Sequence, residues 1–162
     1  MKRAIYPGTF DPFTNGHLDI LCRASEWFDE VVVALLNNSA KQPVFSLAER
    51  YEMIEAAARQ SCTGTVVVRE FHGLLVDFAR EQDAQIVIRG LRALTDFEYE
   101  IQMAHTNKQL APDIEMIFMM ADLRYSYVSS SIVREIGRLG GDIDNMIPAV
   151  NRKRIVERLR ET

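Results

Sequence analysis

Five short apolar segments, each followed by a stretch with helical spacing, constrain the fold of this chain more than any other feature. The five segments cover residues 2–7, 31–36, 65–70, 84–89 and 114–120. They are β-branched or continuously apolar rather than alternating, as strands covered on both faces tend to be. Helical patterns lie between them at residues 18–28, 47–58, 74–81 and 96–110. This alternation predicts a parallel sheet covered by helices.

The unusual residues of the chain lie directly after four of the predicted strands. In a parallel sheet, ligand-binding loops lie at the carboxyl ends of the strands, near the point where the strand order reverses. The four stretches are PGTFDPFTNGH (7–17), NNSAKQP (37–43), RGLRALTDFEYE (89–100) and ADLRYSYVSSS (121–131). We therefore expect a Rossmann-like α/β fold, with helices on both faces of the sheet and four loops that converge on one site.

Length and charge exclude several classes of protein. The 162 residues fit one domain, 1–162, with a C-terminal amphipathic helix from about residue 148. No apolar run approaches the roughly 20 residues of a membrane span. The apolar stretch at the N-terminus is too short for a secretory signal, so we expect a cytoplasmic protein without a membrane partner. A net charge of −4 argues against nucleic acid as a partner, although a local cationic cluster can still bind a small anion.

The cysteines and histidines give no sign of a metal site. Cys22 and Cys62 lack CxxC spacing and neighbouring histidines, so we expect reduced, buried thiols rather than a disulfide or a zinc site. His72 and His105 have no metal-ligand partners at useful spacing. We therefore predict no metal site built by the protein.

The first loop has the features of a phosphate-binding turn. Gly8 lets the chain turn away from the strand, and Thr9 offers a hydroxyl and a backbone N–H. Asn15 is the expected N-cap of the following helix, which places His17 in its first turn. A helix N-terminus attracts an anion, and His17 would present its imidazole to the same anion. The alternative is an ordinary turn with a surface histidine.

Two later loops carry further donors. Ser129, Ser130 and Ser131 open a predicted helix and could cap it, bind phosphate or do both. No GxSxG motif surrounds them, which disfavours a serine nucleophile. Arg89 and Arg92 flank a strand end, where a guanidinium can hold two phosphate oxygens at once or simply be solvated.

Motifs on these loops resemble two signatures of the nucleotidyltransferase superfamily. TNGH (14–17) is similar to the (H/T)xGH signature, with threonine in place of the first histidine, and VSSSIVR (128–134) is similar to ISSTxxR. Together with AKQP (40–43), IRGLRALTDFEYE (88–100) and YSYVSSS (125–131), they make the whole chain resemble the bacterial phosphopantetheine adenylyltransferase family.

This resemblance implies transfer of an adenylyl group from ATP to 4′-phosphopantetheine, with ATP carrying Mg²⁺. It implies His17 and Lys41 as catalytic residues. The implied ATP-binding residues are Thr9, Phe10, His17, Gly90, Leu91, Arg92, Glu100, Tyr125, Ser126, Tyr127, Val128, Ser129, Ser130 and Ser131. The implied residues for the acceptor substrate are Thr9, Lys41, Leu75 and Arg89. It further implies a homohexamer and feedback inhibition by coenzyme A.

Two other functions stay open. A related small nucleotidyltransferase would act on nicotinamide mononucleotide or glycerol phosphate, and fold alone does not separate these acceptors. A nucleotide-binding regulator without catalysis would bind ATP tightly and not turn it over. The presence of both His17 and Lys41 argues against the regulator, because a sensor has no need of charge at the α-phosphate.

Overall fold

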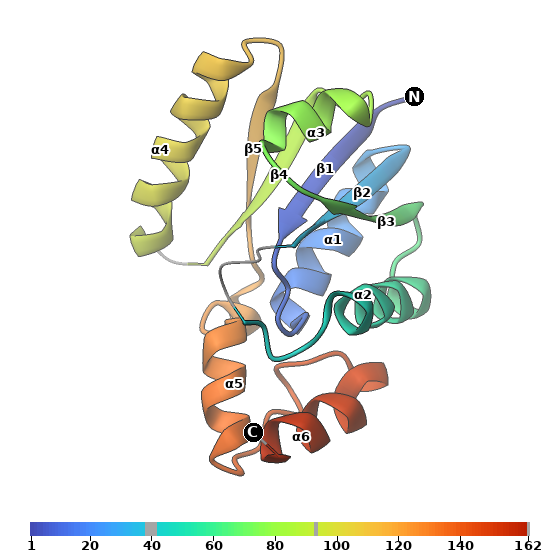
Figure 1. Cartoon of the computed structure of the whole chain (residues 1–162), viewed down its shortest axis with the longest axis vertical. Helices are drawn as coiled ribbons and strands as arrows, with labels where there is room; N and C mark the ends of the chain where they lie inside the picture. The colour runs from blue at the N-terminus through green and yellow to red at the C-terminus, as the bar shows by residue number, and fades with distance from the viewer. Residues whose placement is uncertain (38–41, 93, 162) are drawn as a thin grey trace.

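The computed structural model describes residues 1–37, 42–92 and 94–161. Its centre is a sheet of five parallel strands in the order β3-β2-β1-β4-β5 (Figure 1). The strands are β1 (Arg3–Gly8), β2 (Glu30–Leu36), β3 (Val66–Phe71), β4 (Ile86–Leu91) and β5 (Glu115–Met120). Every predicted strand begins and ends within two residues of the observed one. The predicted parallel sheet is therefore confirmed.

In the part of the chain that the structure describes, six α-helices accompany the sheet. They are α1 (Asn15–Trp27), α2 (Leu47–Ser61), α3 (Leu75–Glu81), α4 (Leu94–Leu110), α5 (Ser130–Arg138) and α6 (Arg152–Glu161). A 3-10 helix, η1 (Leu123–Tyr125), precedes α5, and a second, η2 (Ala149–Asn151), leads directly into α6. The capping box predicted for α2 is present, because the Ser46 hydroxyl accepts the N–H of Glu49 and the Glu49 carboxylate accepts the N–H of Ser46.

Both faces of the sheet are buried, which explains the continuous apolar runs in the sequence. Successive strand residues point to opposite faces. Tyr6 and Val33 join the cluster that holds the apolar sides of α1 and α2, whereas Ile5 and Val32 join the cluster that holds α3. Helices thus cover both faces, as predicted.

A third apolar cluster lies beyond the carboxyl ends of the strands, where α5 and α6 pack (Figure 1). Ile155 and Leu159 of α6 are fully buried in it, together with Phe45 from the segment before α2. The predicted amphipathic helix is present, and its apolar stripe packs against the rest of the chain. Arg152, Arg154 and Arg160 are exposed, whereas Arg158 is half-buried against the segment before α2.

The strand order reverses between β1 and β4. The chain runs outward from β1 through β2 to β3 and then crosses to the other side of β1 to form β4. At such a reversal the loops that follow the two central strands diverge, which leaves a crevice at their carboxyl ends.

The two cysteines form a disulfide, contrary to the prediction of reduced thiols. Cys22 lies on α1 and Cys62 follows α2, and their sulfur atoms are bonded with the two Cα atoms 4.5 Å apart. The prediction was wrong because it relied on spacing along the chain. The packing of α1 and α2 against the same sheet face brings residues 40 positions apart into contact.

Within residues 1–37, 42–92 and 94–161, no helix has the length and apolar character required to cross a membrane.

Candidate active site

A cleft of about 610 Å³ opens at the carboxyl ends of β1 and β4. Its walls come from the loop after β1, the segment before α2, the end of β4 and one side of α5. Residues from each of the four predicted loops line it. The described parts of those loops therefore converge on one site, at the reversal of the strand order.

The helix that follows the first loop is capped by Thr14 rather than by Asn15. The Thr14 hydroxyl accepts the backbone N–H of His17, and the backbone N–H of Thr14 donates to Nδ1 of the His17 ring at 3.1 Å. Asn15 is instead the first residue of α1, where its backbone N–H donates to Met146 and its side chain donates to Asn145. The predicted N-cap was thus one residue too late.

This capping arrangement fixes the tautomer of His17. Because Nδ1 accepts the Thr14 N–H, we assign the ring proton to Nε2, which is then free to donate. The rings of Phe10 and Phe13 lie 5.0 Å and 5.6 Å from the imidazole, centre to centre. Burial, together with the positive charges of Arg92 and Arg89, lowers the pKa of His17 to about 3. The imidazole is therefore a neutral hydrogen-bond donor over the physiological pH range.

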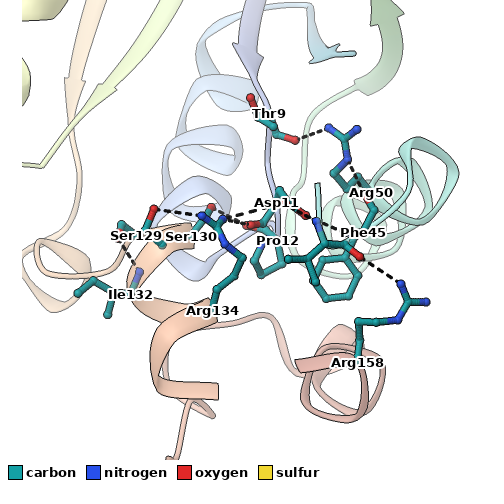
Figure 2. Close-up of polar contacts among 12 residues, drawn as sticks. Thr9, Asp11, Pro12, Phe45, Arg50, Ser129, Ser130, Ile132, Arg134 and Arg158 are labelled. Atoms are coloured by element: carbon teal, nitrogen blue, oxygen red, sulfur yellow. Dashed lines mark hydrogen bonds and ion pairs between the residues drawn. The ribbon is translucent and has the colours of Figure 1, made fainter. Parts of the chain in front are cut away.

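Asp11 connects the first loop to the segment that precedes α2. Its two carboxylate oxygens accept the backbone N–H groups of Val44 and Phe45, both at 2.9 Å. The Arg134 guanidinium on α5 donates to the Asp11 backbone carbonyl, and Figure 2 shows these contacts lying side by side. Asp11 is buried, so these bonds fix the cleft wall on two sides.

Arg89 and Glu100 form a bidentate ion pair in the cleft wall. The Arg89 Nε and Nη2 atoms donate to the two Glu100 carboxylate oxygens at 2.8 and 2.6 Å, and Nη1 donates to the carbonyl of Pro7. Burial lowers the pKa of the Arg89 guanidinium, but the bonds and charge of Glu100, with Tyr6 and Tyr99, raise it by more, so the pKa lies above its ordinary value. The pair holds the guanidinium plane in one orientation at the end of β4.

The N-terminus of α5 supplies hydroxyl and amide groups to the same cleft. Ser129 is the N-cap, and its side chain accepts the N–H of Ile132 at 3.1 Å. Ser130 donates to the carbonyl of Pro12 at 2.8 Å, which ties α5 to the first loop (Figure 2). The first N–H groups of an α-helix have no acceptor within the helix, so this end of α5 is suited to an anion.

Most of the predicted site residues line the cleft. Those that do are Thr9, Phe10, His17, Arg89, Gly90, Arg92, Glu100, Val128, Ser129, Ser130 and Ser131. Tyr125, Ser126 and Tyr127 directly precede Val128 in the chain and do not line the cleft. Leu91 is buried in the sheet and Leu75 packs against the cluster under α3, so neither lines the cleft. Lys41 lies outside the described residues.

Three arginines of the cleft wall were missed in the sequence. Arg50 lies on α2, and Arg134 and Arg138 lie on α5. Arg134 is the last residue of VSSSIVR and could have been found from that motif. With Arg89 and Arg92, the described wall has five arginines against two carboxylates, although the chain has a net charge of −4. The cleft is therefore a local site for anions.

Within the described residues, no group of three or more histidine, cysteine, aspartate or glutamate side chains is arranged to hold a metal ion. The two carboxylates of the cleft wall are already bound, Asp11 to backbone N–H groups and Glu100 to Arg89. These residues do not form a divalent-metal site of their own.

Comparisons with known proteins agree with this geometry. Residues 5–136 match the cytidylyltransferase-like family. The chain is 51% identical to a phosphopantetheine adenylyltransferase of Natranaerobius thermophilus, over 98% of this chain and 96% of the relative. It is 47% identical to a protein of the same name from Clostridium novyi, over 98% of each. A putative nicotinate-nucleotide adenylyltransferase from Vibrio parahaemolyticus shares the fold, with a TM-score of 0.69, 18% identity and coverage of 100% of this chain and 98% of that one. The chain is a nucleotidyltransferase that belongs to the cytidylyltransferase-like family and, within it, to the phosphopantetheine adenylyltransferases.

Proposed function

We propose that this chain transfers an adenylyl group from ATP to 4′-phosphopantetheine, giving dephospho-coenzyme A and pyrophosphate. The observation that carries this proposal is the identity of about half of all residues, over nearly the full chain, to relatives named phosphopantetheine adenylyltransferase. The cationic cleft supports it, because both substrates and both products are anions.

The reaction is a direct displacement at the α-phosphorus of ATP. An oxygen of the acceptor phosphate forms the new bond to this phosphorus, and the bond to the bridging oxygen of pyrophosphate breaks, with its electron pair leaving on pyrophosphate. The nucleophile is already an oxyanion, so no base is needed to create it. The protein has to hold two anions in line and stabilise the charge that develops on the α-phosphate.

His17 is the proposed donor to the α-phosphate. Its Nε2 proton, fixed by the bond from Thr14 to Nδ1, would bind an α-phosphate oxygen as negative charge increases there. A neutral imidazole with a low pKa keeps this donor in one state across the physiological pH range. Lys41 is proposed to place its ammonium between the two phosphates, where a compact charge reduces their repulsion.

The remaining sites are proposed by substrate. Phosphopantetheine would be bound by Thr9, Lys41, Leu75 and Arg89. ATP would be bound by Thr9, Phe10, His17, Gly90, Leu91, Arg92, Glu100 and residues 125–131. The exposed N–H groups at the start of α5 support the assignment of the β- and γ-phosphates to Ser129, Ser130 and Ser131. Mg²⁺ would enter with the nucleotide and shield its phosphate oxygens, which needs few protein ligands.

The proposal is tested by incubating the purified chain with MgATP and 4′-phosphopantetheine and measuring the mass of the product. We expect dephospho-coenzyme A together with one equivalent of pyrophosphate. A His17→Gln variant provides a control for contaminating enzymes, and we expect it to bind ATP but to turn over far more slowly. ATP binding by the unchanged chain without any product would overturn the proposal in favour of a regulator.

A second arm of the same assay separates the possible acceptors. Nicotinamide mononucleotide and glycerol phosphate replace phosphopantetheine, and pyrophosphate release is followed in each case. The shared fold of the Vibrio structure gives no preference between acceptors. We expect turnover with phosphopantetheine alone, and faster turnover with either other acceptor would contradict the assignment.

We further propose one domain over residues 1–162, a homohexamer, inhibition by coenzyme A and a cytoplasmic location. Support for assembly comes from side chains of α4 that are exposed in the single chain, among them Tyr99 at 62% and Leu110 at 51%. Light scattering tests the hexamer, and a monomer at micromolar concentration would contradict it. Coenzyme A titrated into the assay tests inhibition.

A further inference from the structure

Arg50 is the largest fully buried side chain of the described residues, with 2% of its surface exposed. It lies in the first half of α2 and extends toward the loop after β1 (Figure 2). A buried guanidinium has to satisfy its N–H groups within the protein. The bonds that it makes therefore show what this residue does.

The Arg50 guanidinium donates to backbone carbonyl groups of three separate elements. Nη1 donates to Thr9 at 2.8 Å and to Leu36 at 3.2 Å, and Nε donates to Phe45 at 3.0 Å. Thr9 follows β1, Leu36 ends β2 and Phe45 precedes α2. One side chain thus fixes three points of the backbone around the cleft, which it also lines.

Among the residues that the structure describes, the charge of Arg50 has no close counter-ion. No carboxylate of residues 1–37, 42–92 and 94–161 lies within ion-pair distance, and Asp11 and Glu70 act on it only from farther away. Burial lowers the pKa of the Arg50 guanidinium. A buried, unpaired charge is costly for stability, so a role in stability alone does not account for it.

The bond to Thr9 acts on the peptide that precedes Phe10. This peptide is planar, so fixing the Thr9 carbonyl also fixes the direction of the Phe10 N–H. Phe10 has a φ of 51°, in the left-handed region that a residue with a large side chain rarely adopts without support. The Phe10 ring then packs nearly perpendicular to the His17 imidazole, with centres 5.0 Å apart.

We propose that Arg50 is a positioning residue for adenylyl transfer, acting through Thr9 and Phe10 on His17. This inference rests on the proposed function, since it assigns Arg50 a part in that reaction. Arg50 holds the turn in the conformation that aims the Phe10 N–H and the His17 ring at the same phosphate. Without the Arg50 guanidinium, the Phe10 N–H and the His17 ring are still present but are no longer held in the orientation that points at the phosphate.

The test compares Arg50→Lys and Arg50→Met with the same changes at Arg158. Arg158 is a matched control because it donates to the carbonyl of Val44 at 3.1 Å and its guanidinium carbon lies 5.7 Å from the Phe45 ring centre. It supports the same segment as Arg50 but does not line the cleft. The measurements are kcat and KM for both substrates, with circular dichroism to monitor folding.

We expect Arg50→Lys to lower kcat by about 10- to 100-fold, because a donor displaced by about 1 Å loses this much rate. KM for ATP should change less than about threefold, since the binding groups remain. Lysine keeps the charge of Arg50 but not its two-pronged donor geometry. The kcat of Arg50→Lys should therefore exceed that of Arg50→Met by no more than about threefold. Arg158→Lys should stay within about twofold of the unchanged chain in both constants.

Three results would overturn the inference. The first is a folded Arg50→Lys with unchanged kcat, and the second is an equal loss of kcat in the Arg158 variants. The third is failure of Arg50→Lys itself to fold, because the three bonds would then serve stability and not the reaction. Absence of turnover in the unchanged chain would instead refute the proposed function, so the two failures are distinguishable.

Discussion

Replacing His17 by asparagine should make the stability of the protein less sensitive to acid. An exposed histidine has a pKa near 6.5, whereas burial and the charges of Arg92 and Arg89 lower the pKa of folded His17 to about 3. Between these values the unfolded chain binds a proton that the folded chain does not. The free energy of unfolding therefore falls as the pH falls below about 6.5, and this loss ends near the folded pKa.

The magnitude follows from the width of that window. Each pH unit inside it costs about 1.4 kcal/mol, so acidification from about pH 6.5 to about pH 4.5 costs at most about 2.7 kcal/mol through His17 alone. The imidazole lies in the wall of an open cleft, where water screens part of this effect. We therefore expect a contribution of about 2 kcal/mol.

Urea unfolding of both chains at several pH values between about 7.5 and 4.5 measures this contribution. Asparagine keeps an acceptor for the Thr14 N–H but does not titrate, so its curve should fall about 2 kcal/mol less over the window. All other titrating groups are common to the two chains and cancel in the difference. His105→Asn, on an exposed position of α4, is the control for loss of a histidine. Parallel curves for the unchanged chain and the His17 variant would refute the neutral imidazole in the cleft wall.

Four further changes test other parts of the structure. Glu100→Gln leaves the Arg89 guanidinium without its carboxylate and should lower the free energy of unfolding by about 3 kcal/mol in urea titrations. Reduction of the disulfide, which closes a loop of 40 residues, should cost about 4 kcal/mol and lower Tm by roughly 10 °C in scans with and without dithiothreitol. Gly64→Ala would place a Cβ 1.9 Å from the backbone oxygen of Ser25 and should lower the free energy of unfolding by about 3 kcal/mol. Gly73→Ala meets no neighbouring atom, but the φ of 83° at Gly73 should make it cost about 1 kcal/mol. A melt unchanged from that of the original chain would contradict each of these in turn.

The strands and the α2 cap could be predicted because their signals are local. A run such as 31–36 is β-branched and continuously apolar, and it has the same meaning whatever its neighbours are. Ser46 and Glu49 meet within one helical turn, so their reciprocal bonds need no tertiary contact. The convergence of the loops also followed, since the carboxyl ends of parallel strands share one edge of the sheet.

The errors came where distant contacts decide between local alternatives. Thr14 and Asn15 are both good N-caps, and the choice is made by the C-terminal region, where Met146 accepts the backbone N–H of Asn15. Cys22 and Cys62 are joined because two helices pack on the same face of the sheet. The three carbonyls that Arg50 binds belong to elements whose proximity no spacing in the sequence encodes.

The Arg89 and Glu100 pair shows why residue roles assigned one at a time are incomplete. The resemblance gives Arg89 to the acceptor phosphate and Glu100 to ATP, yet the two side chains are bonded to each other through two donors and two acceptors. A guanidinium has five N–H groups, so the bonds to Glu100 and Pro7 leave two for a ligand. The carboxylate also offsets part of the positive charge that an incoming phosphate would meet. The proposed binding of phosphate at Arg89 and of ATP at Glu100 would therefore be coupled, because any ligand that draws one side chain away changes the orientation and charge presented by the other.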